Sequence, residues 1–436
     1  MDSLIIQQVI ADQKNLIRQK SRGIIRKINF EKHLKSKQVS VITGIRRSGK
    51  STLLLQMADL FHDFHFITFD DERLLNFQVT DFNTLLIELN KHIPSQTIVI
   101  DEVQNIEGWE RFVRRLHDQG YKVFISGSNS KLLSSELATH LTGRYIKTEL
   151  YPFSFFEYLQ LKEIDFKVKS TLNLGKLSSA LDEYLSKGGF PEFLRSDDPE
   201  FLHRIYEDII YKDLIVRFGI KNTKGFKNMT QYLFTNFTKE TNYNSLAGIL
   251  GFSSTTSVRD YVSYLCESYM IFELYRYDYS LKKQYQSNKK IYTIDNGLRN
   301  AISFRTGQDK GRMLENLIFI ELKRRGIECW FYKTKNNLEV DFLWFDIEPR
   351  LIQVCYDLTD PSTLKREISA LETAMNELSV KSSLILSYNE KRDVVTTTGT
   401  ISVVPVMEWL MGTGEEGVRS EEKAQSTEHR AQGKKE

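Results

Sequence analysis

A glycine-rich loop between two apolar stretches places the strongest constraint on how this chain can fold. The loop reads Gly44-Ile45-Arg46-Arg47-Ser48-Gly49-Lys50-Ser51-Thr52. Its two glycines permit backbone angles that a side chain would forbid, so successive N–H groups can point inward and bind an anion. Apolar residues at 38–43 predict a strand before the loop, and their spacing over 49–61 predicts a helix after it. We therefore expect a phosphate site at the N-terminus of that helix.

The residue types at the end of this loop indicate nucleotide chemistry. Gly44, Gly49, Lys50 and Ser51 occupy every required position of the P-loop pattern. In such a loop the lysine supplies a cation to the outer phosphates, and the serine hydroxyl binds Mg²⁺. We expect residues 44–52 to bind a nucleoside triphosphate, with Lys50 also acting in catalysis and Ser51 as a metal ligand.

A second apolar run ends in two adjacent acids. Residues 97–100 predict a buried strand that delivers Asp101 to the magnesium shell beside Ser51. Glu102 then lies where a general base can orient or deprotonate the attacking water. This acid predicts hydrolysis as well as binding.

Polar residues follow two further predicted strands. Residues 121–126 precede Gly127-Ser128-Asn129, where Ser128 or Asn129 is predicted either to sense the γ-phosphate or to form an ordinary turn. Arg144 is expected either to stabilise charge on the transferred phosphoryl group, in cis or from a neighbouring chain, or to form a structural ion pair. The acids 70–72, after a strand at 64–69, favour helix capping over ligand contact.

Length and composition bound the remaining possibilities. A chain of 436 residues is too long for one core, so we expect more than one domain. The net charge of +3 does not by itself predict a nucleic-acid or membrane partner, and no apolar run is long enough to span a bilayer. Its 3 cysteines form neither a metal pattern nor a disulfide framework, which favours a cytoplasmic protein.

Several motifs together resemble one family. They are Gly-Ile-Arg-Arg-Ser-Gly-Lys-Ser, Ile-Asp-Glu-Val-Gln-Asn, Ser-Gly-Ser-Asn-Ser-Lys-Leu-Leu, Leu-Thr-Gly-Arg-Tyr and Leu-Tyr-Pro-Phe-Ser-Phe-Phe-Glu, in that order. Over residues 20 to about 410 the chain resembles prokaryotic AAA-like ATPases that carry a C-terminal domain of unknown function, DUF4143. That family is similar to the archaeal ATPase branch of the P-loop superfamily. The resemblance implies ATP, rather than GTP, as the nucleotide.

The segment after the predicted ATPase core has helix-turn-helix spacing. Helical patterns at 244–251 and 255–268 flank a short turn, and Lys282-Lys283 and Lys289-Lys290 flank a predicted hairpin wing. Such a winged helix binds DNA through its second helix and wing, but the second helix has no basic excess. DNA and protein partners therefore both stay open.

The C-terminal region resembles a restriction-endonuclease-like core. Glu315 and Asp341 match the acids that hold Mg²⁺ in that chemistry, whereas Gln353 and Cys355 stand where Glu and Lys are required. We predict a nuclease-like fold that has lost cleavage, unless a lysine from elsewhere replaces the missing one. The lysines considered for that replacement are Lys323, Lys333 and Lys365.

We thus expect an α/β protein with a P-loop NTPase parallel sheet and helical lid, then a winged helix and a nuclease-like α/β domain. The predicted boundaries are 1–150 for the ATPase core, 151–240 for the lid, 241–305 for the winged helix, 306–411 for the nuclease-like domain and 412–436 for a disordered tail. The leading function is Mg²⁺-dependent ATP hydrolysis coupled to motion of the C-terminal domains. The alternatives are a nucleotide-gated DNA- or protein-binding switch and an ATP-regulated DNA nuclease.

Overall fold

The chain folds into two compact units. The computed structural model describes residues 1–92, 94–128, 141, 143–166, 170–303 and 309–412. The first unit comprises Met1–Phe153, Phe190–Gly219 and Ser263–Met270, and the second comprises Ser154–Gly189, Ile220–Val262 and the chain from Ile271 onward. The sequence-based domains divide the chain more finely than this, and their boundaries stay predictions. The predicted tail lies outside the described residues, apart from Gly412.

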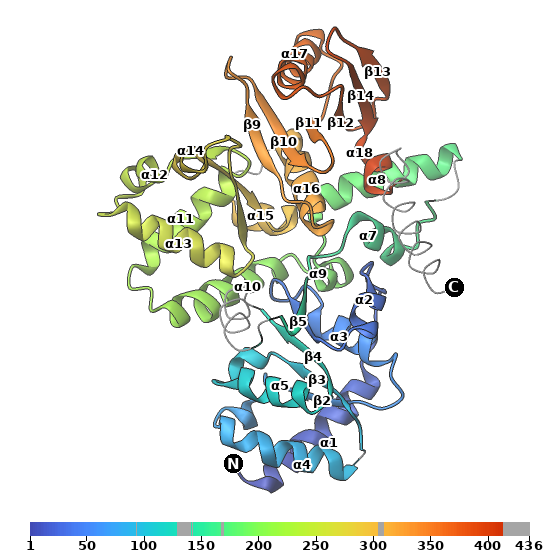
Figure 1. The fold of residues 1–436 in the computed structure, drawn as a ribbon, viewed down its shortest axis with the longest axis vertical. Helices are drawn as coiled ribbons and strands as arrows, with labels where there is room; N and C mark the ends of the chain where they lie inside the picture. Colours follow the sequence, from blue (N-terminus) through green and yellow to red (C-terminus); the bar gives the residue numbers. More distant parts are fainter. Residues whose placement is uncertain (93, 129–140, 142, 167–169, 304–308, 413–436) are drawn as a thin grey trace. The chain divides into compact units, whose positions relative to one another are not determined.

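A five-stranded parallel sheet forms the centre of the first unit (Figure 1). Its order is β2-β3-β4-β1-β5, so strands that are distant in sequence lie beside one another. The strands are β1 (Val39–Thr43), β2 (His65–Thr68), β3 (Thr97–Asp101), β4 (Lys122–Gly127) and β5 (Tyr145–Glu149). The helices of this unit are α1 (Ser3–Gln19), α2 (Phe30–Lys35), α3 (Lys50–Ala58), α4 (Phe82–His92), α5 (Trp109–Asp118), α9 (Pro191–Ser196) and α10 (Phe201–Asp208), with the short turns η1 (Glu72–Leu74), η2 (Val79–Asp81) and η3 (Val103–Asn105) and the π-helix η4 (Ile209–Val216). The predicted parallel sheet is confirmed.

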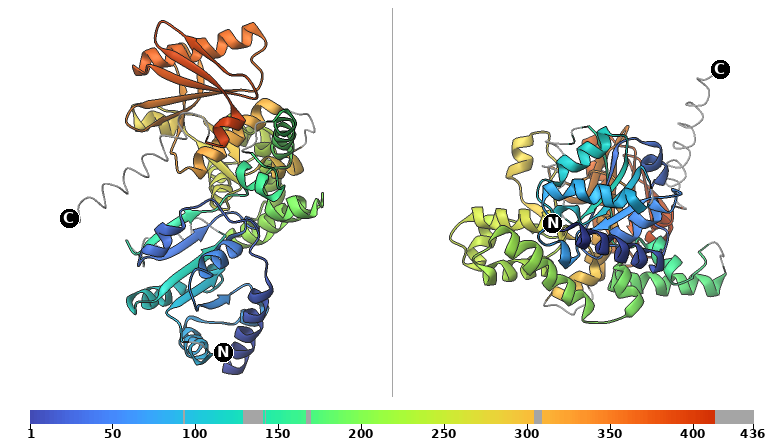
Figure 2. Two further views of the ribbon diagram at one scale, coloured as in Figure 1. Left: turned by 90° about the vertical axis from the view of Figure 1, so that its right-hand side faces the viewer. Right: turned by 90° about the horizontal axis from the view of Figure 1, so that it is seen from below.

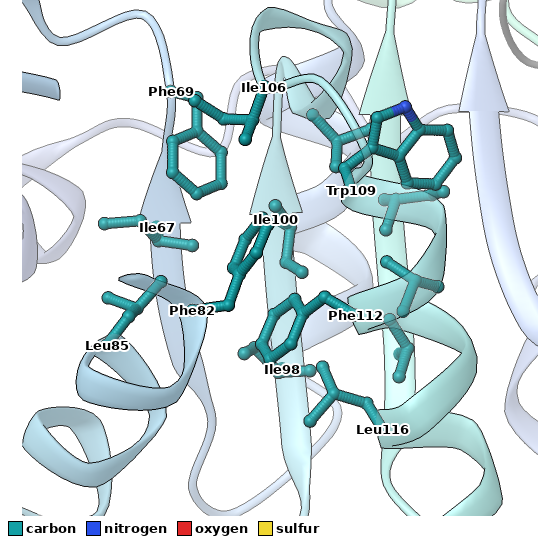
Figure 3. Packing of buried hydrophobic residues seen from close by; sticks show 14 of the residues in the cluster. Ile67, Phe69, Phe82, Leu85, Ile98, Ile100, Ile106, Trp109, Phe112 and Leu116 are labelled. Atoms are coloured by element: carbon teal, nitrogen blue, oxygen red, sulfur yellow. The ribbon is translucent and has the colours of Figure 1, made fainter. Parts of the chain in front are cut away.

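Both faces of this sheet are buried because helices cover each of them. Alternate residues of β3 point to opposite faces, so Ile98 and Ile100 pack beneath α4 and α5 (Figure 3). There the Phe82 and Phe112 rings stack at 4.1 Å between centroids. Val99 belongs instead to the core formed with α3. This two-sided burial explains why the strands read as continuous apolar runs.

The turn that leaves β1 approaches the end of β5 closely. The Leu150 N–H donates to the Thr43 carbonyl at 2.7 Å. A Cβ built on Gly44 would lie 2.1 Å from the Leu150 carbonyl oxygen, and Gly44 has φ +147°. Glycine is therefore required here by both space and backbone angle.

The second unit contains a six-stranded sheet of order β13-β14-β12-β11-β10-β9. Its strands are β9 (Trp330–Lys333), β10 (Glu339–Phe345), β11 (Pro349–Cys355), β12 (Ser382–Ser387), β13 (Arg392–Val395) and β14 (Thr400–Pro405). Helices α16 (Lys310–Arg324) and α17 (Pro361–Leu378) pack against β11 (Figures 1 and 2). The remaining helices are α7 (Phe155–Leu161), α8 (Thr171–Lys187), α11 (Thr223–Thr235), α12 (Tyr243–Leu250), α14 (Leu281–Gln286), α15 (Asn296–Ile302) and α18 (Val406–Leu410), while α13 (Thr255–Glu267) crosses the division between the units.

A small antiparallel sheet also belongs to the second unit. Strands β6 (Glu240–Thr241), β8 (Lys289–Thr293) and β7 (Ile271–Leu274) lie in that order. Two features differ from the predicted basic hairpin wing. Helix α14 occupies part of the expected hairpin, and Lys290 is 3% exposed. Lys290 therefore adds nothing to a basic surface, because its buried ammonium contacts the carboxylates of Glu315, Glu339 and Asp341. In the described part of the chain, no helix combines the length and apolar character needed to cross a membrane.

Substitution of Gly44 tests the close approach between the turn and β5. We expect Gly44→Ala to lower the free energy of unfolding by at least about 2 kcal/mol, because the new methyl group must displace backbone. Gly120→Ala is the matched control, since Gly120 has φ +85° but no described residue beyond its chain neighbours lies within 4 Å of the place that a methyl group would take. For Gly120→Ala the free energy of unfolding should fall by only roughly 1 kcal/mol, the cost of placing alanine in a left-handed backbone conformation. Equal losses in denaturant titrations would show that the approach is unimportant.

Candidate nucleotide site

The glycine-rich loop connects β1 to α3 as the sequence predicts. Helix α3 begins at Lys50, and Gly49 precedes it with φ +97°. The Lys50 side chain is buried, and its Nζ donates to the carbonyls of Gly44 and Ile45, each at 3.1 Å. Burial lowers the pKa of the Lys50 ammonium, and the carboxylates of Glu102 and Asp101 offset this only in part. The loop thus holds a buried cation beside its own carbonyl groups.

Asp101 ends β3 at the same edge of the sheet. Its carboxylate accepts hydrogen bonds from the hydroxyls of Ser126 and Ser51. Burial and the neighbouring Glu102 raise the pKa of Asp101, and these two hydroxyls lower it. The contact between Ser51 and Asp101 joins a hydroxyl and a carboxylate oxygen, the kinds of ligand that Mg²⁺ prefers. These two residues therefore fit a magnesium ion.

Glu102 has a strained backbone and a paired side chain. Its φ of +50° lies in the left-handed region, which is unusual for a residue other than glycine. The Gln104 amide donates to Glu102 Oε2 and also lies 3.5 Å from the Ser128 hydroxyl. Gln104 therefore connects the predicted base with a predicted sensor. Sequence reasoning missed this link, although Gln104 directly follows the acidic pair and Val103.

Arg26 supports the loop through its backbone. Its side chain is buried and donates to the Ser48 carbonyl at 2.8 Å and the Tyr151 carbonyl at 2.6 Å. The guanidinium also lies 5.1 Å from the Phe153 ring centroid. In the sequence, Arg26 stands in a basic segment before the first predicted strand, and no pattern there indicates this role.

The two arginines inside the loop form ion pairs with the segment 190–219. Arg46 Nε and Nη2 donate to the two carboxylate oxygens of Asp213, each at 3.0 Å. Arg47 lies 3.3 Å from Glu192, and both side chains of that pair are more than half exposed. Neither acid was singled out in the sequence, because no local pattern connects them to the loop.

Arg144 lies at the other edge of the sheet. It precedes β5, which runs parallel to β1, and its carbonyl accepts from the N–H of Val39 at the start of β1. Its guanidinium pairs with Asp118 at 2.7 Å. Arg144 therefore does not face the loop of its own chain, so the catalytic role in cis is wrong. A role from a neighbouring chain stays a prediction.

The other predicted polar residues have mixed outcomes. Ser128 follows β4 at the same edge as the loop and contacts Gln104, whereas Asn129 lies outside the described residues. The side chain of Asp71 caps the turn η1, as the capping interpretation of the acids 70–72 expects.

The second unit brings together the acids of the nuclease-like template around a lysine. Lys290 Nζ lies 2.7 Å from Glu339, 3.0 Å from Glu315 and 3.1 Å from Asp341. Glu315 also accepts from the Tyr292 hydroxyl at 2.7 Å. Burial lowers the pKa of the Lys290 ammonium, but the three carboxylates outweigh it and raise this pKa well above its ordinary value. The lysine is therefore a buried cation.

The positions that depart from the template make other contacts. Gln353 accepts from the Asp341 N–H at 3.2 Å and donates to Glu367 at 2.8 Å. The Cys355 thiol contacts the Asp357 carbonyl at 3.2 Å. The lysine in contact with Asp341 is Lys290, which was not among the replacements that the sequence suggested.

Comparison with known proteins identifies the domain that contains the loop. A model of an AAA domain matches residues 36–159, which include the glycine-rich loop, Asp101 and Glu102. A model of a domain of unknown function, DUF8612, matches residues 178–309. The DUF4143 likeness stays a prediction. The structure of the Walker-type ATPase PABY2304 of Pyrococcus abyssi aligns with 66% of this chain and 99% of its own, at 14% identity and a TM-score of 0.42.

Two relatives match most of the chain. An uncharacterized protein of Haemophilus influenzae is 29% identical over 395 residues, which cover 86% of this chain and 94% of that protein. The uncharacterized protein MJ1544 of Methanocaldococcus jannaschii is 37% identical over 428 residues, which cover 94% of this chain and 95% of the relative. The chain therefore belongs to the same family as MJ1544, and its own N-terminal part carries an AAA-like P-loop ATPase domain.

Proposed function

We propose that this protein binds ATP with Mg²⁺ at the glycine-rich loop and hydrolyses it to ADP and phosphate. The observation that carries the proposal is the meeting of Lys50, Ser51, Asp101 and Glu102 at one edge of the parallel sheet. This edge holds the carboxyl ends of the strands, where open α/β sheets bind ligands. The AAA domain match over residues 36–159 supports the same assignment.

The chain's own groups divide the work between binding and water activation. Backbone N–H groups of the loop bind the phosphate oxygens, and the Lys50 ammonium exchanges the Gly44 and Ile45 carbonyls for the outer phosphates. Ser51 and Asp101 would hold Mg²⁺, which neutralises charge on the β- and γ-phosphate oxygens. Glu102 orients the attacking water and accepts its proton, once its carboxylate is no longer held by Gln104.

A second candidate function is a nucleotide-gated switch with little turnover. The contact between the Gln104 amide and Glu102 favours it, because a base engaged by an amide is less available to water. Under this alternative, ATP occupancy alone would set how the C-terminal elements hold DNA or a protein. ATP binding without phosphate release would support the switch over the hydrolase.

In our proposal the C-terminal elements respond to ATP and do not cleave DNA. Helices α11, α12 and α13 with the sheet β6-β8-β7 follow the order expected of a winged helix, which supports a DNA or protein contact there. At position 355 the six-stranded sheet carries a cysteine where nuclease chemistry requires a lysine. Lys290 lies against Glu315 and Asp341, where cleavage chemistry would require a divalent cation.

Substitutions at the loop and at the predicted base should have separable effects. Lys50→Ala should abolish ATP binding, because it removes the cation that faces the outer phosphates. Glu102→Gln should retain binding but slow phosphate release by roughly 10²-fold or more, since an amide cannot accept the proton. Equilibrium binding of ATP and the rate of phosphate release check the two effects.

Lys35→Ala is the control for these variants, because Lys35 is exposed and pairs with Glu31 within α2. It should match the parent chain in both assays. Unchanged turnover in Glu102→Gln would contradict the role assigned to this carboxylate.

Removal of the buried lysine should destabilise the second unit. Lys290→Met leaves Glu315, Glu339 and Asp341 without their shared cation, so the free energy of unfolding should fall by about 3–5 kcal/mol. Lys289→Met is the matched control on the same strand. The Lys289 ammonium lies over the Tyr243 and Tyr275 rings, and its loss should cost about 1 kcal/mol or less. Calorimetric unfolding measures both, and equal losses would contradict a structural role for this cluster.

A further inference from the structure

The ion pair between Arg46 of the loop and Asp213 of η4 is bidentate and has a defined geometry. The Arg46 guanidinium donates through both Nε and Nη2, so the two side chains are held in parallel, bidentate contact. Both partners are largely shielded from solvent, with side-chain exposures of 29% and 22%. By contrast, the neighbouring pair between Arg47 and Glu192 is 53% and 54% exposed and is joined by one contact at 3.3 Å.

The charges of groups that would handle the phosphates also act on Arg46. The hydrogen bonds that Arg46 donates to Asp213 raise the pKa of the Arg46 guanidinium, burial lowers it, and the carboxylates of Glu102 and Asp70 raise it further. Asp213 in turn acts on Lys50, whose pKa it raises. Arg46 and Asp213 therefore share one electrostatic environment with the predicted base and the phosphate-binding lysine.

A bound triphosphate would compete with Asp213 for this arginine. The guanidinium fork binds phosphate oxygens as readily as carboxylate oxygens, through the same bidentate geometry. A triphosphate also adds negative charge beside Asp213. The Arg46 guanidinium then gains more by binding the phosphate oxygens than by keeping its contact with the Asp213 carboxylate. ADP lacks the terminal phosphoryl group and competes less.

We propose that Arg46 is a specificity-determining residue that exchanges Asp213 for the terminal phosphate of ATP, so that the ion pair distinguishes ATP from ADP. This inference rests on the proposed function, because it needs a triphosphate in the loop. Asp213 lies within η4, an uncommon π-helical segment that continues α10. Release of Asp213 therefore gives η4 a direct means of responding to the nucleotide.

Affinities of the full-length protein for ADP and for the non-hydrolysable β,γ-imido analogue of ATP test this exchange. Asp213→Asn keeps the shape of the side chain but removes its charge. It should tighten binding of the ATP analogue by at least about 5-fold, with ADP affinity nearly unchanged. Arg46→Gln should weaken the ATP analogue more than ADP.

Glu192→Gln is the matched control, since it removes the carboxylate of the adjacent, exposed ion pair. It should leave the ratio of the two affinities unchanged. The exchange is overturned if Asp213→Asn and Arg46→Gln both leave the ratio of the two affinities at the parent value. It is also overturned if Asp213→Asn weakens binding of the ATP analogue. In both cases the proposal that the loop binds ATP stands. If the parent chain binds neither nucleotide, the proposed function falls and the exchange falls with it.

Discussion

The parallel pairing of β1 with its neighbours decides where every group of the nucleotide site lies. Because β1 pairs with β4, and β4 with β3, the carboxyl ends of these strands meet at one edge. That edge receives the loop from β1, Asp101 and Glu102 from β3, and Ser126 and Ser128 from β4. The same pairing places Arg144 at the opposite edge, before β5. Burial on both faces keeps the strands in register, so the carboxyl ends that carry the site stay together.

Charge balance is the second constraint on this edge. Lys50 and Arg46 are cations of the loop, and Asp70, Asp101, Glu102 and Asp213 surround them. Carboxylates so close to a phosphate site would repel a polyanion unless hydrogen bonds or ion pairs stabilised their charges. Asp101 is satisfied by two hydroxyls, Glu102 by an amide and Asp213 by a guanidinium. In the proposed function, ATP binding rearranges these contacts, and Mg²⁺ supplies positive charge where the serine and Asp101 meet.

The sequence was most informative where local pattern and chemistry coincide. The loop and the strands β1 to β4 were predicted to within a residue or two, because each strand is a short apolar run followed by polar residues or glycines. Strand β5 was not predicted. Long-range partners could not be predicted in the same way. Asp213 is 167 residues from Arg46, and Lys290 is 51 residues from Asp341, so no spacing rule relates them. A lysine in a short basic run favours a solvated surface, and only the tertiary fold buries Lys290 among three acids.

A crystal structure of the full chain with Mg²⁺ and the β,γ-imido analogue of ATP tests the proposed nucleotide site most directly. We expect the triphosphate to lie against the loop from Gly44 to Ser51, with the Lys50 ammonium on its outer phosphates. We also expect a magnesium ion at the Ser51 hydroxyl and beside the Asp101 carboxylate. A nucleotide bound elsewhere, or a triphosphate in the loop with its metal ion remote from both Ser51 and Asp101, would contradict the assignment.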